Sequence, residues 1–358
     1  MQKQQYPKSQ REITRLASKE KGSHTGSGWR GSLSLFIIIL FSFALPIHAL
    51  TIKLGSLVPQ GSPWERSIRM LASEWTKISD GKVILRVYTN GIAGDEGDMI
   101  RKMRFGQLQA AGLSMSGLSQ IFGDILVPAI PMLVENEEEF KYLFDRMIPY
   151  FQGELEKRGF KILFWNFAGW AYLFSRHPVV YPADLIPQKL WIAEGNTEEV
   201  NAWKSLGFKP VTFSTMDLMV QLQTGGVEAF VTSPLIAASN QWFGIAKNMS
   251  GFRWNPFFGA FIITSNTWNK IPARMRCEIL EAAKRCGVEM EQAAIQSIED
   301  AVEVMQKYGL VIGDYPEDAK RAWIQYMEKA VQLLIKEKFS AECYLRAKSY
   351  LDEYRKSQ

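Results

Sequence analysis

Few side chains in this 358-residue sequence are suited to metal or nucleophilic chemistry. Of its three histidines, only His177 lies beyond the first 49 residues. A metal site with several histidine ligands is therefore excluded from the main part of the chain, and a Ser-His or Cys-His mechanism would depend on His177 alone. Residues 91–94 (GIAG) are not a phosphate loop, because the glycine spacing is wrong and no Lys-Ser/Thr pair follows. We predict no cofactor, and catalysis by carboxylates stays open.

The sequence holds three cysteines, Cys277, Cys286 and Cys343. Cys277 and Cys286 fall in one predicted helix, nine positions apart, which is about 13 Å and too far for a disulfide. We predict three structural thiols, and the alternative is a disulfide that includes Cys343.

The first 49 residues have the pattern of a secretory signal. A basic stretch precedes thirteen largely apolar residues, Leu33–Leu45, and Ala49 supplies a small residue for cleavage. The apolar run is shorter than the roughly 20 residues that span a bilayer. We predict that residues 1–49 are a signal peptide, with an uncleaved N-terminal anchor as the alternative.

The net charge of +5 comes from this N-terminal segment. Beyond residue 49 the chain holds 35 basic and 35 acidic side chains. An exported chain without net charge exerts no general attraction on nucleic acid, so we predict no nucleic-acid partner.

From Leu50 onward, patterns typical of strands and helices alternate. Residues 51–57 alternate apolar with small or polar side chains, and Ser62-Pro63 then predicts a helix start. Asn136 with Glu139, and Asn196 with Glu199, each resemble a capping box. Further strands are predicted at 83–87, 161–164, 190–192, 229–232 and 261–264, and a long helix from Pro272 to about Tyr308. Repeated strand-helix units favour a two-domain α/β protein with mostly parallel sheets.

Five segments, in this order, resemble the periplasmic solute receptors of tripartite ATP-independent periplasmic (TRAP) transporters, of the dicarboxylate-receptor type. The segments are TIKLGSLVPQGSPWERSIRMLASEWTKISDGKVILRVYTNG, DEGDMIRKMRFGQLQAAGLS, YPADLIPQKLWIAEGNTEEVNAWKSLGFKPV, LQTGGVEAFVTSP and FIITSNTWNKIP. The resemblance runs from about Leu50 to the C-terminus.

The resemblance implies a non-enzymatic, two-lobed binding protein with mixed, mostly parallel sheets flanked by helices, in which crossing strands and a long helix link the lobes. The expected boundaries are 50–168 plus 258–298 for lobe I and 169–257 plus 299–358 for lobe II. Such a receptor works in the periplasm, captures a small molecule in the cleft between its lobes and delivers it to permease subunits in the inner membrane. In some systems of this kind a periplasmic tetratricopeptide-repeat protein is a further partner.

The sequence departs from the family where the ligand carboxylate is normally bound. The family's central motif carries an arginine that pairs with that carboxylate, and here Ala193 stands at its place. A second common arginine would fall near Ala171, and the asparagine before a proline is replaced by Ser233. A buried carboxylate without a cationic partner costs several kcal/mol. We therefore expect an apolar or amphipathic ligand.

Aromatic residues are frequent in the same segments, and they either stack on the ligand or fill the core. We predict the following ligand-binding residues, with Glu194 or Ser233 as the polar contact: Trp170, Tyr172, Trp191, Ala193, Glu194, Phe213, Ser233 and Trp254. Two other functional classes remain as alternatives. One is an exported ligand sensor or partner protein on the same scaffold, and the less favoured one is an exported enzyme.

Overall fold

The computed structural model describes residues 49–358. The predicted signal peptide or anchor, residues 1–49, lies outside the described residues apart from Ala49, so its cleavage stays a prediction. Within residues 49–358, no helix is both long and apolar enough to cross a bilayer.

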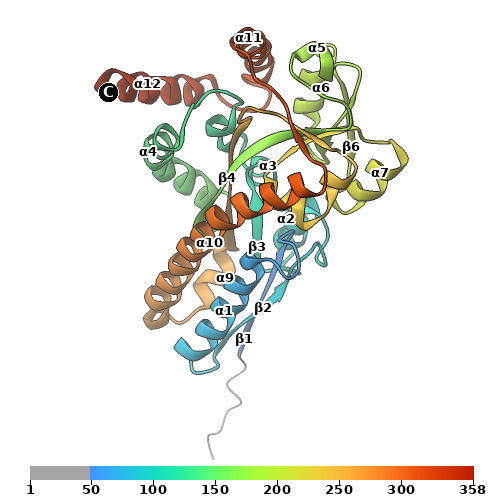
Figure 1. Cartoon of the computed structure of the whole chain (residues 1–358). Coiled ribbons are helices and arrows are strands. Elements are labelled where there is room, and N and C mark those ends of the chain that lie inside the picture. The colour runs from blue at the N-terminus through green and yellow to red at the C-terminus, as the bar shows by residue number, and fades with distance from the viewer. Residues whose placement is uncertain (1–48) are drawn as a thin grey trace, which may run out of the picture. The chain divides into compact units, whose positions relative to one another are not determined.

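Strands alternate with helices along the described chain, which confirms the predicted α/β class (Figure 1). The strands are β1 (Leu50–Ser56), β2 (Val83–Tyr88), β3 (Ala110–Ser114), β4 (Phe160–Ser175), β5 (Lys189–Ala193), β6 (Lys209–Phe213), β7 (Ala229–Thr232), β8 (Asn248–Met249), β9 (Asn255–Thr264) and β10 (Val311–Ile312). The helices are α1 (Pro63–Ile78), α2 (Glu96–Arg104), α3 (Met115–Ser119), α4 (Glu137–Lys157), α5 (Pro182–Leu185), α6 (Thr197–Ser205), α7 (Leu218–Thr224), α8 (Pro234–Ser239), α9 (Ser265–Lys270), α10 (Ala273–Lys307), α11 (Glu317–Leu334) and α12 (Ala341–Ser357). The 3-10 helices within residues 49–358 are η2 (Gly123–Ala129), η3 (Thr215–Asp217) and η4 (Trp242–Gly244).

Lobe I is the set of elements around β1, β2, β3 and β9. β1 pairs in parallel with β2 and with β3, and β3 pairs antiparallel with β9. Helix α1 begins as predicted, because Ser62 Oγ accepts a hydrogen bond from the Glu65 amide at 3.2 Å and Pro63 needs no amide partner. Ile68 and Trp75 on its apolar face are fully buried.

Lobe II is the set of elements around β5, β6 and β7. β5 pairs in parallel with both β6 and β7, and β7 pairs antiparallel with the end of β4. The combined strand order is β2-β1-β3-β9-β4-β7-β5-β6, so the sheets are mixed and the two lobes are joined through β9 and β4.

β4 is the crossing strand, and it is much longer than the predicted strand at 161–164. It pairs with β9 between Phe160 and Ala171 and with β7 from Tyr172 to Ser175. Its register with β9 shifts twice, and Gly169 has a positive φ of 80° beside the second shift. Each shift interrupts the alternation of inward and outward side chains, so a simple period-two pattern does not reveal the whole strand.

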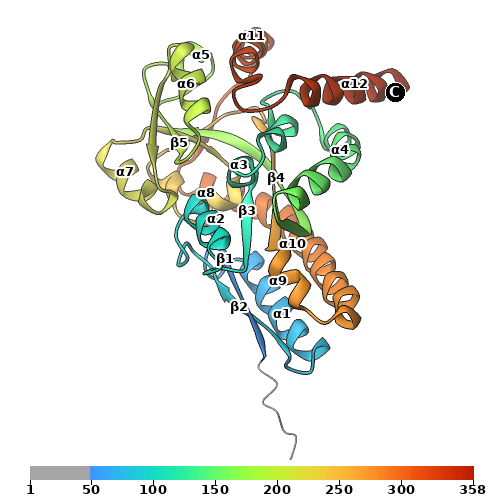
Figure 2. The same ribbon diagram turned by 180° about the vertical axis from the view of Figure 1, so that it is seen from behind.

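The predicted long helix is confirmed as α10, which contacts both lobes. It packs against α1 and β4 and, further along, against α8. Trp75 Nε1 donates to the Ile279 carbonyl and Trp64 Nε1 donates to the Met290 carbonyl, each at 3.1 Å. Figures 1 and 2 show α10 extending from beside α1 and α9 toward lobe II.

The predicted boundaries of the lobes stay a prediction. Helix α11, in the range expected for lobe II, packs against α5 and α6. Helix α12, in the same range, packs instead against α4 and η2. Asp124 of η2 fixes its start by accepting from the Ser340 amide at 2.6 Å, and Asp124 also accepts from the Tyr150 hydroxyl of α4 at 2.7 Å.

Candidate ligand-binding cleft

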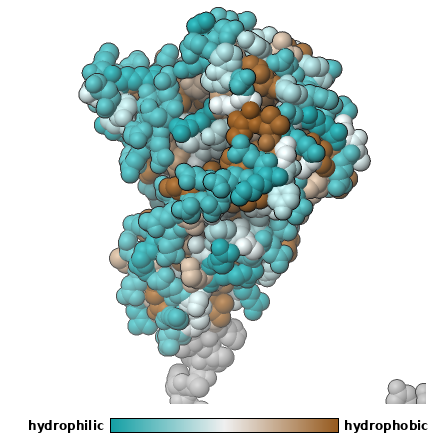
Figure 3. Space-filling view, in the orientation of Figure 1, coloured by the Kyte–Doolittle hydropathy of each residue, from teal (hydrophilic) through white to brown (hydrophobic). Residues whose placement is uncertain are grey.

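A cavity of about 460 Å³ lies between elements of lobe I and lobe II. This volume falls within the range of small-molecule sites, about 300–1,000 Å³. Its walls come from β3, α3 and β9 of lobe I and from β5, α6 and α8 of lobe II. Figure 3 shows hydrophobic residues gathered in a hollow of the surface next to α10.

The wall of the cavity is mainly apolar and aromatic. Its aromatic residues are Trp64, Trp191, Trp203, Trp242, Trp254, Phe257, Phe258, Phe261 and Phe339. The indole N–H of Trp191 donates to the Phe213 carbonyl at 2.9 Å, so this ring needs no hydrogen bond from a ligand. Such a surface can stack on rings and bury the apolar parts of a ligand.

Three of the predicted ligand-binding residues, Trp191, Ala193 and Trp254, line this cavity. Ala193 ends β5, at the edge where ligands of open α/β sheets bind. Contact between these three residues and a ligand stays a prediction.

The other five predicted residues are not among those that line the cavity. Trp170 packs in the lobe I core and stacks under Arg253, with 5.1 Å between the guanidinium carbon and the ring centroid. Ser233 caps α8 and is fully buried, whereas Glu194 is exposed.

The remaining two, Tyr172 and Phe213, lie on strands. Tyr172 pairs with Thr232 where β4 joins β7, and Phe213 ends β6, where it contributes its carbonyl to Trp191.

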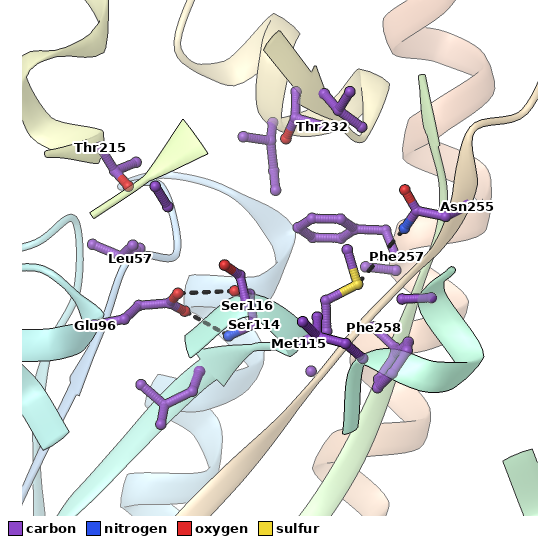
Figure 4. Close-up of a pocket in the computed structure, with 18 of the residues that line it drawn as sticks. Leu57, Glu96, Ser114, Met115, Ser116, Thr215, Thr232, Asn255, Phe257 and Phe258 are labelled. Carbon is purple, nitrogen blue, oxygen red and sulfur yellow. Dashed lines mark hydrogen bonds between the residues drawn. The ribbon is translucent and has the colours of Figure 1, made fainter. Parts of the chain in front are cut away.

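Glu96 is the acid at the lobe I end of the cavity. Its carboxylate accepts hydrogen bonds from the Ser114 amide at 2.5 Å and from Ser114 Oγ at 2.8 Å (Figure 4). Burial raises the pKa of Glu96 to about 7, although the Ser114 hydrogen bonds oppose this shift, and the neighbouring charge of Asp95 adds to it. Near neutral pH this carboxyl group is therefore divided between its neutral and charged forms.

Glu199 of α6 and Lys338, which follows α11, also line the cavity. Burial raises the pKa of Glu199, and the charge of Lys338 opposes that shift. Among the described residues that line the cavity, Lys338 is the one cation, and no arginine is present.

The sequence did not identify Glu96, Glu199 or Lys338 as cleft residues. For Asn196 and Glu199 the sequence predicts a capping box at a helix start. Helix α6 does begin directly after Asn196, but the predicted capping bond is wrong, because the Asn196 side chain makes none. The side-chain amide of Asn196 donates instead to Ser116 Oγ of lobe I at 2.9 Å.

At Asn136 the helix start and half of the predicted box are confirmed, because the Asn136 side chain accepts from the Glu139 amide at 2.8 Å where α4 begins. The Glu139 side chain accepts from the Glu135 amide, at 2.9 Å, instead of from the Asn136 amide.

Hydrogen bonds join the two lobes at the rim of the cavity. Asp95 Oδ2 accepts from the Thr215 amide at 2.8 Å and from Ser214 Oγ at 2.9 Å. Gln120 Nε2 donates to the Glu194 carbonyl at 3.1 Å. These bonds hold the lobes together around the cavity.

Known proteins share both the sequence pattern and the fold. The family model of DctP, bacterial extracellular solute-binding protein, family 7, matches residues 54–338. The sialic acid-binding periplasmic protein SiaP of Vibrio cholerae is 21% identical over 309 residues, which is 85% of this chain and 93% of SiaP.

Two solved structures of TRAP periplasmic solute-binding proteins show the same two-lobed fold. The protein from Sulfurospirillum deleyianum, with bound succinate, is 19% identical with a TM-score of 0.77 and covers 84% of this chain and 99% of its own. The protein from Desulfovibrio salexigens, with bound orotic acid, is 17% identical with a TM-score of 0.77 and covers 86% of this chain and 99% of its own. The chain belongs to the bacterial extracellular solute-binding proteins, family 7.

Proposed function

We propose that this protein is a periplasmic TRAP receptor that captures an apolar or amphipathic small molecule and delivers it to a permease in the inner membrane. The observation that supports this ligand class is the wall around Ala193, where aromatic side chains line the cavity and no arginine is present among the described lining residues. The similar proteins named above bind succinate, orotic acid or sialic acid, all of which carry a carboxylate.

Small, strongly polar acids should bind this cavity poorly. A closed apolar cavity removes water from the acid, and the bidentate arginine that would compensate is absent at Ala193. An apolar molecule meets no such penalty, and each buried methylene contributes about 0.8 kcal/mol. The permease, and a periplasmic tetratricopeptide-repeat protein as a further partner, are proposed from the family resemblance.

The ligand class is tested by mass spectrometry of molecules extracted from the gently purified protein, together with calorimetry. We expect an apolar or amphipathic compound in the extract and no micromolar binding of succinate or orotate. Micromolar binding of either acid to the unmodified protein would contradict the proposed ligand class.

Substitution of Ala193→Arg tests whether this wall contacts the ligand. The larger, charged side chain should fill apolar space that the ligand occupies and reduce retention of the extracted compound at least tenfold, a cost of about 1.4 kcal/mol or more. Ala273→Arg, an exposed substitution at the start of α10, is the matched control and should leave retention unchanged. Equal retention by both variants would show that Ala193 does not contact the ligand.

A further inference from the structure

We propose that Lys338 binds a single carboxylate head group of an amphipathic ligand, whose apolar chain then extends along the aromatic wall of the cleft. This inference rests on the proposed function and specifies its ligand class as aliphatic monocarboxylates. The anchoring cation is supplied by the segment between α11 and α12, which lines the cavity.

The position of Lys338 is fixed by its backbone. Its amide donates to the Leu334 carbonyl at 2.9 Å, and its carbonyl lies against Gly123, where a Cβ atom would come within 1.6 Å of that oxygen. The side chain is only 7% exposed. The ammonium group therefore remains at the cavity wall rather than extending into solvent.

The ammonium group has two partners in the protein, an amide oxygen at hydrogen-bond distance and a carboxylate in a longer ion pair. Of its three donors, one is used by Asn196 Oδ1 at 3.2 Å. The carboxylate of Glu198 lies 3.6 Å away, beyond the roughly 2.7–2.9 Å of a charge-assisted hydrogen bond, and its side chain is 38% exposed. A carboxylate oxygen from a ligand would complete the set of partners of this largely buried cation.

Two acids could oppose such a head group, Glu198, which is ion-paired with Lys338, and Glu199, which lines the same cavity. Burial raises the pKa of Glu199, and the charge of Lys338 opposes this shift.

Apolar residues line the cavity between Lys338 and the aromatic wall. Met327, Ala330 and Leu334 of α11 line the cavity on one side, and Ala202 and Trp203 of α6 line it on the other. The Trp203 ring is stacked near Trp254, with 6.2 Å between centroids. A chain that starts at Lys338 would thus bury its methylenes along this path, and each one should improve the affinity about fourfold.

The test compares three probes of equal chain length, decanoate, decanol and decylammonium, by calorimetry with the full protein at neutral pH. We expect decanoate to bind at least tenfold more tightly than decanol and decylammonium to bind most weakly. The assignment of Lys338 would be overturned if decanol bound as tightly as decanoate, or if decylammonium bound more tightly than decanoate. This comparison needs no variant.

Variants then identify the residue. Lys338→Met should weaken decanoate binding at least tenfold and leave decanol unchanged, whereas Lys338→Arg should retain most of the decanoate affinity. Lys336→Met, which removes an exposed charge two residues away, should change neither. If Lys338→Met leaves decanoate binding unchanged while decanol still binds, the anchor is refuted and the apolar cleft stands. If neither decanoate nor decanol binds the unmodified protein, the proposed apolar cleft itself fails.

Discussion

At the scale of single residues, Glu96 links the stability of the protein to pH. Its pKa is raised from 4.5 to about 7 in the folded state, so the folded chain binds this proton more tightly than the unfolded chain. The stability that this proton contributes is fully present below pH 4.5 and is lost as the pH rises through 7. The loss is about 3 kcal/mol, since each pKa unit corresponds to about 1.4 kcal/mol.

Glu96→Gln should remove this dependence, because glutamine stays neutral and can still accept from the Ser114 amide. We expect the variant to be more stable than the unmodified protein at pH 8 and to differ little from it at pH 4.5. Urea unfolding at both values measures this, and Glu194→Gln, at an exposed acid, is the control that should change neither value. Parallel pH profiles for Glu96→Gln and the unmodified protein would show that Glu96 does not titrate as described.

At the scale of elements, the packing of α10 on β4 depends on Gly287. A Cβ atom at this position would lie 2.7 Å from the Phe164 ring, which is buried and stacked on Phe261. Alanine would improve the helix propensity by about 1 kcal/mol, but the clash costs about 1–3 kcal/mol. Gly287→Ala should therefore lower the free energy of unfolding or leave it unimproved.

Gly153 in α4 provides the matched control, because no atom lies within 4 Å of the Cβ that alanine would add there. Gly153→Ala should raise the free energy of unfolding by about 0.5–1 kcal/mol. Chemical denaturation of both variants measures the difference. Equal stabilisation by the two substitutions would mean that α10 can move away from β4 at little cost.

At the scale of the whole molecule, Asp95 holds the two lobes together. Asp95→Asn keeps an oxygen that can cap α2 but replaces the acceptor of the Thr215 amide with a donor. This should disfavour the joined arrangement by about 1–3 kcal/mol. We expect a larger radius of gyration for this variant in solution scattering, and weaker retention of the extracted ligand.

Asp98→Asn is the control for closure, because Asp98 lies on the same helix and pairs only with the exposed Arg101. It should leave the scattering curve unchanged. For the unmodified protein, ligand binding should be accompanied by compaction. Identical curves for the Asp95 variant and the Asp98 variant would show that the Asp95 bonds do not control closure.

The sequence by itself determined those features of this protein that have local or patterned causes. Ser62-Pro63 and the apolar spacing that follows predict α1, and the stretch from Pro272 to Tyr308, which lacks proline after its start, predicts α10. Alternating strands and helices predict the α/β class, and motif order indicates the receptor family. The same motifs predict an arginine at the position of Ala193. This prediction depends only on the order of residues along the chain.

Only the tertiary structure decided which side chains share the cleft. Lys338 bonds to Asn196, 142 positions away, and no local pattern records such a pair. β4 crosses between the lobes as predicted, but its two register shifts change which side chains face inward and which face outward. Trp170 therefore packs in the core. The side chain of Asn196 could have capped α6, but it is buried and must form hydrogen bonds with the groups packed around it. One of these groups is Ser116 of the opposite lobe.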